Sequence, residues 1–156
     1  MVDSVTKIIF VCHGNICRSP MAEFVMKKLV RDAGMEGRFS IASMAVSFEE
    51  SGNPVYPPAR RKMAEHGIPF DDHRACRISL ADFRQADLVV IMDESNRRLL
   101  RSIVGEAADG GKVRKLMEFA GLSRDVEDPW YTGDFESCYR DISTACEAML
   151  AFLCRS

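Results

Sequence analysis

Apolar and polar residues alternate in blocks along the chain, and the first blocks predict a strand, a loop and a helix. Residues 8–11 form a short β-branched and aromatic run, which is typical of a buried strand. Beyond a polar stretch, apolar residues recur from Met21 to Val30 at helical spacing, and Lys27 and Lys28 fall on the complementary face. Gly34 ends this pattern, so we expect a helix over about residues 19–33.

The rest of the chain continues this alternation of strands and helices. Residues 88–92 are uniformly apolar, which suits a strand covered on both faces and therefore a parallel sheet between helices. The pattern predicts a doubly wound α/β sheet with right-handed crossovers. No repeat or change of composition marks a second domain, so residues 1–156 are expected to form a single domain. The other predicted elements are strands over 39–45 and 113–117, helices over 59–66 and about 94–103, and a last helix with an apolar stripe from Phe135 to Leu153.

Composition and charge argue against several classes of function. The 156 residues carry 21 basic and 23 acidic side chains, and this net charge of −2 gives no general attraction to nucleic acid or to membrane surfaces. The apolar runs are too short to span a bilayer, so we expect no membrane insertion. The six cysteines lack the spacing of a secreted disulfide framework, and no basic segment followed by an apolar stretch precedes them. A cytoplasmic location is therefore expected.

Three polar clusters follow the predicted strands, at residues 12–19, residues 43–47 and Asp93. Ligands of open α/β sheets bind beyond the carboxyl ends of the strands, which is where these clusters fall. The first cluster joins a strand to the N-terminus of a helix, so several backbone N–H groups without helical partners can converge on one point. We therefore expect an anion-binding loop at residues 12–19.

The side chains of this loop suit phosphate chemistry. Arg18 can bind two phosphate oxygens, and Gly14 and Asn15 tolerate the positive φ angles of a concave loop. The amide dipoles that attract phosphate also stabilise a thiolate at Cys12, which is then a nucleophile facing phosphorus. Ser19, at or near the start of the helix, can donate its hydroxyl proton to that sulfur and help it to leave later. The loop lacks the glycine-lysine pair of a Walker A sequence, so it is not a nucleotide-binding loop of that kind.

These residues resemble a known family signature. The segment Val11-Cys12-His13-Gly14-Asn15-Ile16-Cys17-Arg18-Ser19-Pro20 is similar to the signature of the low-molecular-weight protein tyrosine phosphatases. Further similarities lie at residues 66–68, 73–75, 87–93 with Asn96, and 128–131, so the resemblance extends across nearly the whole chain. It implies a four-stranded parallel sheet flanked by helices on both faces, and an enzyme that hydrolyses phosphotyrosine in proteins or peptides without a cofactor.

The resemblance also implies roles for individual residues. It implies a phosphocysteine intermediate on Cys12, and proton donation by Asp128. It implies phosphate binding by Arg18 and the rest of the loop, namely His13, Gly14, Asn15, Ile16, Cys17 and Ser19. Ser43 and His73, together with Asn15, are expected to brace the loop through hydrogen bonds. We expect inhibition by phosphate-like oxyanions, and a monomer or weak dimer. No metal is expected, because the spacing of His66, His73 and Cys76 matches no standard zinc pattern.

The Asp128-Pro129 pair is expected to supply the proton that a phenolate leaving group needs. A phenol has a pKa of about 10, so its rapid expulsion at neutral pH requires a positioned acid. Pro129 restricts Asp128 to an extended conformation, which can aim the carboxyl along a loop. In the second step the same carboxylate would take a proton from the attacking water. Trp130 and Tyr131 offer flat apolar walls for a phenyl ring at the cleft entrance.

Two positions depart from the family pattern. Glu49 stands where relatives usually carry an aromatic residue, and Phe48 precedes it. Either Phe48 substitutes for that aromatic through a shifted loop, or one wall is acidic and peptides with basic residues near the phosphotyrosine are preferred. His13 stands where relatives more often carry an apolar or small residue. It is either a rim residue with no role, or an imidazolium that tightens substrate binding at mildly acidic pH.

Three other interpretations of the function of this loop remain open. Arsenate reductases of this fold relay a disulfide through further cysteines, and only Cys76 lies in the relevant region. Protein-arginine phosphatases tend to carry threonine where Ile16 stands, which favours a phenyl ester here. A catalytically silent phosphopeptide-binding module is a third alternative.

Oxidation of a Cys12 thiolate to a sulfenic acid would allow Cys17 to form a reversible disulfide with it, as the family resemblance also implies.

Overall fold

A computed structural model describes residues 4–155, and a parallel sheet of four strands lies at its centre. The strands are β1 (Thr6–Cys12), β2 (Phe39–Ala45), β3 (Leu88–Ile91) and β4 (Val113–Lys115), in the spatial order β2-β1-β3-β4. In the parallel register Phe10 lies opposite Ser43 on one side and Val90 on the other. The expected four-stranded parallel sheet is confirmed.

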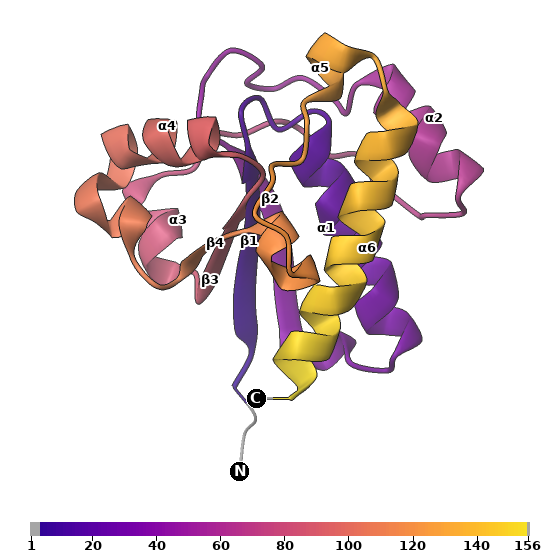
Figure 1. The fold of residues 1–156 in the computed structure, drawn as a ribbon, viewed down its shortest axis with the longest axis horizontal. Coiled ribbons are helices and arrows are strands. Elements are labelled where there is room, and N and C mark those ends of the chain that lie inside the picture. The colour runs from indigo at the N-terminus through magenta and orange to yellow at the C-terminus, as the bar shows by residue number, and fades with distance from the viewer. Residues whose placement is uncertain (1–3, 156) are drawn as a thin grey trace.

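Helices cover both faces of this sheet, as expected. On one side lie α1 (Arg18–Asp32), α2 (Pro57–Glu65) and α6 (Phe135–Cys154), and on the other lie α3 (Leu80–Gln85) and α4 (Glu94–Val104) (Figure 1). Alternate residues of β1 serve the two cores: Ile8 and Phe10 pack in the core under α1 and α6, while Ile9 and Val11 pack in the core under α3 and α4. The uniformly apolar central strands follow from this burial on both faces.

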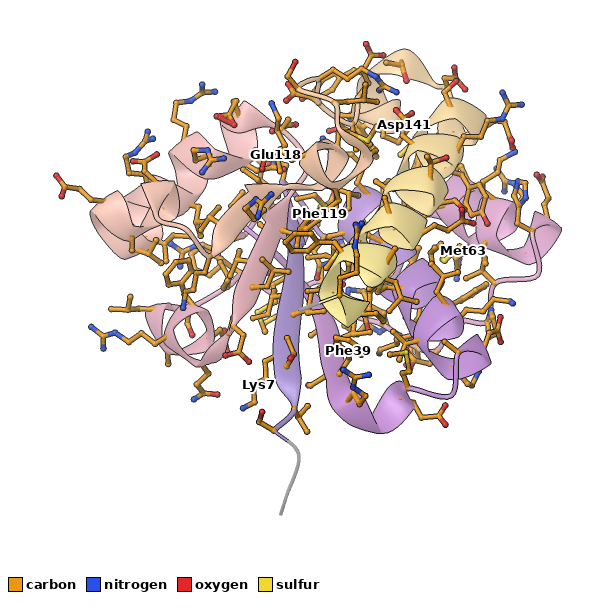
Figure 2. The ribbon with its side chains drawn as sticks, turned by 60° about the horizontal axis from the view of Figure 1, so that its bottom comes forward. Lys7, Phe39, Met63, Glu118, Phe119 and Asp141 are labelled. Atoms are coloured by element: carbon orange, nitrogen blue, oxygen red, sulfur yellow. The ribbon has the colours of Figure 1, made fainter. Side chains whose placement is uncertain are left out.

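Several predicted boundaries need correction. The helix predicted over 59–66 begins two residues earlier, at Pro57, since proline suits the first turn of a helix. The strand predicted over 113–117 ends at Lys115, and a 3₁₀-helix (Leu116–Ala120) follows. That 3₁₀-helix turns back to pack on α6: the ring of Phe119, labelled in Figure 2, lies 5.6 Å from the ring of Phe152. The strand therefore ends before the apolar residues Leu116 and Met117, which pack with the 3₁₀-helix instead.

Two short α-helices were not predicted, nor were the 3₁₀-helices Glu36–Arg38 and Gly105–Asp109. The helix α3 has six residues and begins with a capping box between Ser79 and Asp82. These capping residues are visible in the sequence, but the apolar pattern that follows them is too short to predict a helix. The helix α5 (Pro129–Thr132) is a single turn that begins directly after Asp128. In Figure 1 it lies at the end of the molecule where the carboxyl ends of the strands are found, far from the C-terminus of α6. This end also carries the loop between β1 and α1.

No helix in residues 4–155 combines the length and the apolar character that are needed to cross a lipid bilayer.

Candidate active site

Cys12 ends β1 and points its sulfur at three hydrogen-bond donors of the following loop. The side chain is 3% exposed. Its Sγ accepts from the backbone N–H of Asn15 at 3.3 Å and of Ser19 at 3.4 Å, and lies 3.0 Å from Ser19 Oγ. Ser19 Oγ itself accepts a hydrogen bond from Asn15 Nδ2 at 2.8 Å, which leaves the hydroxyl proton for the sulfur. The positive ends of these three dipoles all point toward Cys12 Sγ.

Ser19 lies near the start of the helix, as expected, but it does not cap it. The N-cap of α1 is Cys17, whose side chain makes no capping hydrogen bond, and Ser19 is the second residue of the helix. Its hydroxyl therefore serves the sulfur of Cys12 rather than a helical N–H group.

Asn15 holds the loop in its curved shape. Its φ angle is +62°, which makes it the one non-glycine residue with positive φ in residues 4–155, and its side chain is fully buried. Nδ2 donates to Ser19 Oγ and, at 3.0 Å, to Ser43 Oγ. Oδ1 accepts from His73 Nε2 at 2.9 Å and from the backbone N–H of Cys76 at 3.2 Å. Every donor and acceptor site of this amide is thus used, and the three residues expected to brace the loop do lie together.

Glu23 extends this network, and sequence reasoning missed it. The carboxylate is nearly buried, and accepts from Ser43 Oγ and Lys27 Nζ, each at 2.6 Å. His73 Nδ1 lies 3.7 Å from it. A glutamate in an amphipathic helix usually faces water, so the pattern gave no reason to single it out. The available signal was its place within the otherwise apolar and small residues 20–26.

Arg18 is buried beneath the loop and is held by acidic groups from distant parts of the chain. Its Nη1 donates to Asp93 Oδ2 at 2.7 Å and to the carbonyl of Val126 at 2.8 Å, and its Nη2 lies 3.3 Å from Asp128 Oδ2. Burial opposes the positive charge, but Cys12, Asp93 and Asp128 outweigh it and raise the pKa of Arg18. The guanidinium therefore stays charged in a site where an unpaired cation would be costly.

Asp128 reaches the same site from the other end of the sequence. Its backbone is extended before Pro129, as predicted, with φ −78° and ψ 113°. One carboxylate oxygen caps α5 by accepting from the N–H of Trp130 at 3.0 Å, and the other faces Arg18. The cap fixes the orientation of the carboxyl group, which is the requirement for a directed proton transfer.

A pocket above the sulfur gathers most of the residues expected at the site. Glu49 and Glu50 line it together with Trp130 and Tyr131, and Glu50 was not predicted. Phe48 does not line the pocket: its ring is 69% exposed and lies 4.4 Å from the guanidinium carbon of Arg77, so it does not substitute for the missing aromatic. The pocket is lined by Cys12, His13, Gly14, Asn15, Ile16, Cys17, Arg18, Glu49, Glu50, Asp128, Trp130 and Tyr131.

Comparison with known proteins agrees with this geometry. A family described as low molecular weight phosphotyrosine protein phosphatase matches residues 7–156. The chain belongs to this family. It is therefore an enzyme of the protein tyrosine phosphatase class.

Members of this phosphatase family from distant organisms are similar over nearly their whole length. The low molecular weight protein-tyrosine-phosphatase YfkJ of Bacillus subtilis is 36% identical over 92% of this chain and 93% of its own. The human low molecular weight phosphotyrosine protein phosphatase is 38% identical over 96% of this chain and 98% of its own.

Solved structures extend the likeness to the fold. The crystal structure of YfkJ superposes with a TM-score of 0.92 at 35% identity, over 97% of this chain and 96% of that one. The structure of a Drosophila arginine phosphatase has a TM-score of 0.84 at 28% identity, over 95% of this chain and 98% of that one. The fold is thus similar both to a protein named as a tyrosine phosphatase and to a protein named as an arginine phosphatase.

The other cysteines of this phosphatase differ in their surroundings. Cys17 is buried beside the site, and burial together with Cys12 and Asp128 raises the pKa of its thiol. Cys138 and Cys146 are buried on α6, where desolvation raises their pKa values as well. Cys76 and Cys154 are exposed. Cys12 therefore differs from its buried neighbours in having three donors directed at its sulfur.

Proposed function

We propose that this protein hydrolyses phosphotyrosine in proteins or peptides, and small aryl phosphates, through a phosphocysteine intermediate on Cys12. The observation that carries the proposal is the convergence of Cys12 Sγ, the buried Arg18 and the Asp128 carboxyl on one pocket. A nucleophile, an oxyanion-binding cation and a proton donor are the three groups that phosphomonoester hydrolysis by this route requires.

The binding step uses the free edge of Arg18 and the amides of the loop. Both N–H groups of Nη1 are engaged by Asp93 and Val126, and one N–H of Nη2 faces Asp128, so Nε and the second N–H of Nη2 form the edge that can receive two phosphate oxygens. Because Asp93 also caps α4, with its Oδ1 accepting from the N–H of Asn96 at 2.8 Å, the guanidinium is held by a rigid element. The phosphate then sits with its phosphorus over Cys12 Sγ.

In the first chemical step the Cys12 thiolate attacks phosphorus. A sulfur–phosphorus bond forms as the bond between phosphorus and the phenolic oxygen breaks. Asp128 transfers its proton to that oxygen, so that neutral phenol leaves instead of phenolate. Trp130 and Tyr131 line the entrance through which the ring departs, and Trp130 is supported by the ring of Tyr56 at 5.0 Å.

In the second step water releases the phosphate. The Asp128 carboxylate accepts a proton from water, whose oxygen attacks phosphorus as the sulfur–phosphorus bond breaks. The leaving thiolate returns to its three donors, of which the hydroxyl of Ser19 is the shortest contact at 3.0 Å. Inorganic phosphate is released, and phosphate-like oxyanions that occupy the same loop are expected to compete with substrate.

A phosphopeptide panel with phosphotyrosine, phosphoserine and phosphoarginine tests the substrate and the acid together. The wild type should hydrolyse phosphotyrosine preferentially, and Asp128→Asn should lower kcat for it by about 10²- to 10⁴-fold. Asp109→Asn, which alters an exposed carboxylate paired with Arg101, serves as the matched control and should retain full activity.

The panel also separates the alternatives. Preference for phosphoarginine would favour an arginine phosphatase, which matters because the fold is similar to one such enzyme. Binding of phosphopeptides without turnover would indicate a silent binding module. A separate assay with arsenate and a thiol reductant covers the remaining alternative, since reduction of arsenate through a cysteine relay would indicate an arsenate reductase. Any of these outcomes would contradict the proposed activity.

A further inference from the structure

The two positions that depart from the family pattern contact each other at the mouth of the pocket. His13 Nε2 lies 2.7 Å from Glu49 Oε2, although 36 residues separate them in the sequence. Both side chains are accessible, at 39% and 70% of their surface, so the contact lies on the rim and not in the core. A histidine N–H donor and a carboxylate acceptor at this distance form a charge-assisted hydrogen bond.

The segment that carries Glu49 is seated on the catalytic loop by backbone contacts. The N–H of Val46 donates to the carbonyl of Cys12 at 3.1 Å, and Ser47 Oγ donates to the carbonyl of His13 at 3.0 Å. Gly14 permits the close approach, because a Cβ atom there would lie only 3.1 Å from Cγ of Glu50. The position of Glu49 relative to Cys12 is therefore fixed by the fold, and His13 fixes the direction of its carboxylate.

The residues that line the pocket include three carboxylates, Glu49, Glu50 and Asp128, against the single guanidinium of Arg18. Arg18, the cation of the pocket floor, is committed to Asp93, Asp128 and the substrate phosphate. Glu50 is paired with the neutral amide of Asn53 at 2.8 Å, so its charge is not compensated there. Glu127 lines an adjoining cleft that shares Asp128 and Tyr131 with the pocket. Phosphate does not neutralise these carboxylates, and their field acts on whatever flanks the phosphotyrosine.

We infer that Glu49, held over the pocket mouth by His13, makes this enzyme prefer phosphotyrosine peptides with lysine or arginine next to the phosphotyrosine. The inference rests on the proposed function, since it requires a phosphotyrosine with its phosphate on Arg18. With the phosphate on the pocket floor and the ring beside Trp130, the peptide backbone passes the rim. A basic flanking side chain can then reach the outer face of the Glu49 carboxylate. Glu49 is the specificity-determining residue, and His13 is a positioning residue.

Matched phosphotyrosine peptides that differ only in lysine, alanine or glutamate at the flanking positions test this preference. For the wild type, kcat/KM should be about two- to fivefold higher with lysine than with alanine, and lower with glutamate than with alanine. The preference should shrink as salt is raised from low to physiological ionic strength, because the charges are exposed. The ratio between two peptides within one variant does not depend on the amount of folded enzyme.

Variants of the pair separate the two roles. Glu49→Gln should bring the lysine-to-glutamate ratio toward one, while Glu106→Gln, an exposed carboxylate outside the pocket, should leave it unchanged. His13→Leu should lower the ratio in part, and His13→Gln, which keeps a donor, should restore some of it. In the Glu49→Gln background, His13→Leu should produce no further change in the ratio, because the carboxylate that it positions is gone.

Two results would overturn the inference while leaving the proposed function intact. One is equal wild-type turnover of the lysine and glutamate peptides, and the other is a wild-type preference that survives Glu49→Gln. If no phosphotyrosine peptide is hydrolysed by the wild type, the proposed function fails and the inference fails with it.

Discussion

Oδ1 of Asn15 lies 2.9 Å from Nε2 of His73, and this hydrogen bond joins the catalytic loop to a segment 58 residues away. An amide oxygen can only accept, so the histidine must carry its proton on Nε2. Its other nitrogen, Nδ1, faces the carboxylate of Glu23 at 3.7 Å. The loop is thus braced by β2 through Ser43, by α1 through Glu23 and by the segment around His73. This arrangement prepares the loop amides before a phosphate arrives.

Two substitutions of Asn15 should separate its conformational role from its hydrogen bonds. Asn15→Gly keeps the positive φ without strain but removes four buried hydrogen bonds, and we expect a loss of roughly 2 kcal/mol or more in the free energy of unfolding. Asn15→Ala should lose about 1 kcal/mol more, because alanine is strained at this φ. Urea unfolding of the three proteins measures both steps. Equal stability of wild type and Asn15→Gly would contradict the bracing role.

Mild peroxide should link Cys12 to Cys17. Peroxide converts the Cys12 thiolate to a sulfenic acid, and the Cys17 thiol then attacks that sulfur and expels water. Burial raises the pKa of Cys17, so Cys12 should be the cysteine that is oxidised first. Mass spectrometry should find the bridge, and a thiol reductant should restore activity. Cys17→Ser should be inactivated irreversibly under the same conditions, while Cys138→Ser should behave as wild type. Irreversible inactivation of the wild type without a bridge would exclude this switch.

Glu136 on α6 should contribute to stability only above strongly acidic pH. Hydrogen bonds from Lys62 and His66 are the main cause that lowers its pKa from 4.5 to about 2. Because the folded pKa is the lower one, the stabilisation is fully present above about pH 4.5 and is lost as the pH falls toward 2. Unfolding measured across this window should show a shallower acid dependence for Glu136→Gln than for wild type. Glu147→Gln, on an exposed position of the same helix, is the control. Parallel curves for wild type and Glu136→Gln would contradict the assignment.

The spacing of apolar residues predicts an element correctly where those residues are buried by the element itself, as in a central strand. The run at β3 is buried on both faces, so its apolar residues mark a central strand without ambiguity. The boundary of β4 was wrong because Leu116 and Met117 are apolar for a different reason: they are buried in a 3₁₀-helix that packs on α6. Apolar character alone does not distinguish these two kinds of burial.

The candidate site was predictable where chemistry is concentrated in a short segment. The loop from Cys12 to Ser19 contains the proposed nucleophile, the cation and the hydroxyl within eight residues, so a local pattern is enough to propose its function. Asp93 was noticed as a polar residue at a strand end, but its contact with Arg18 depends on the strand order. The pairing of His13 with Glu49 depends on how residues 46–50 are seated on the loop, which no local pattern reveals.

The central claim is that phosphorus is transferred to the sulfur of Cys12, and the most direct test is to trap that intermediate. Rapid acid quenching during turnover of para-nitrophenyl phosphate, followed by mass spectrometry under conditions that preserve phosphocysteine, measures which residue carries the phosphoryl group. We expect a single phosphorylation on Cys12 that forms in a burst with the phenol product and is absent from Cys12→Ser. Full hydrolysis by Cys12→Ser, or a phosphoryl group on another residue of the wild type, would contradict the account.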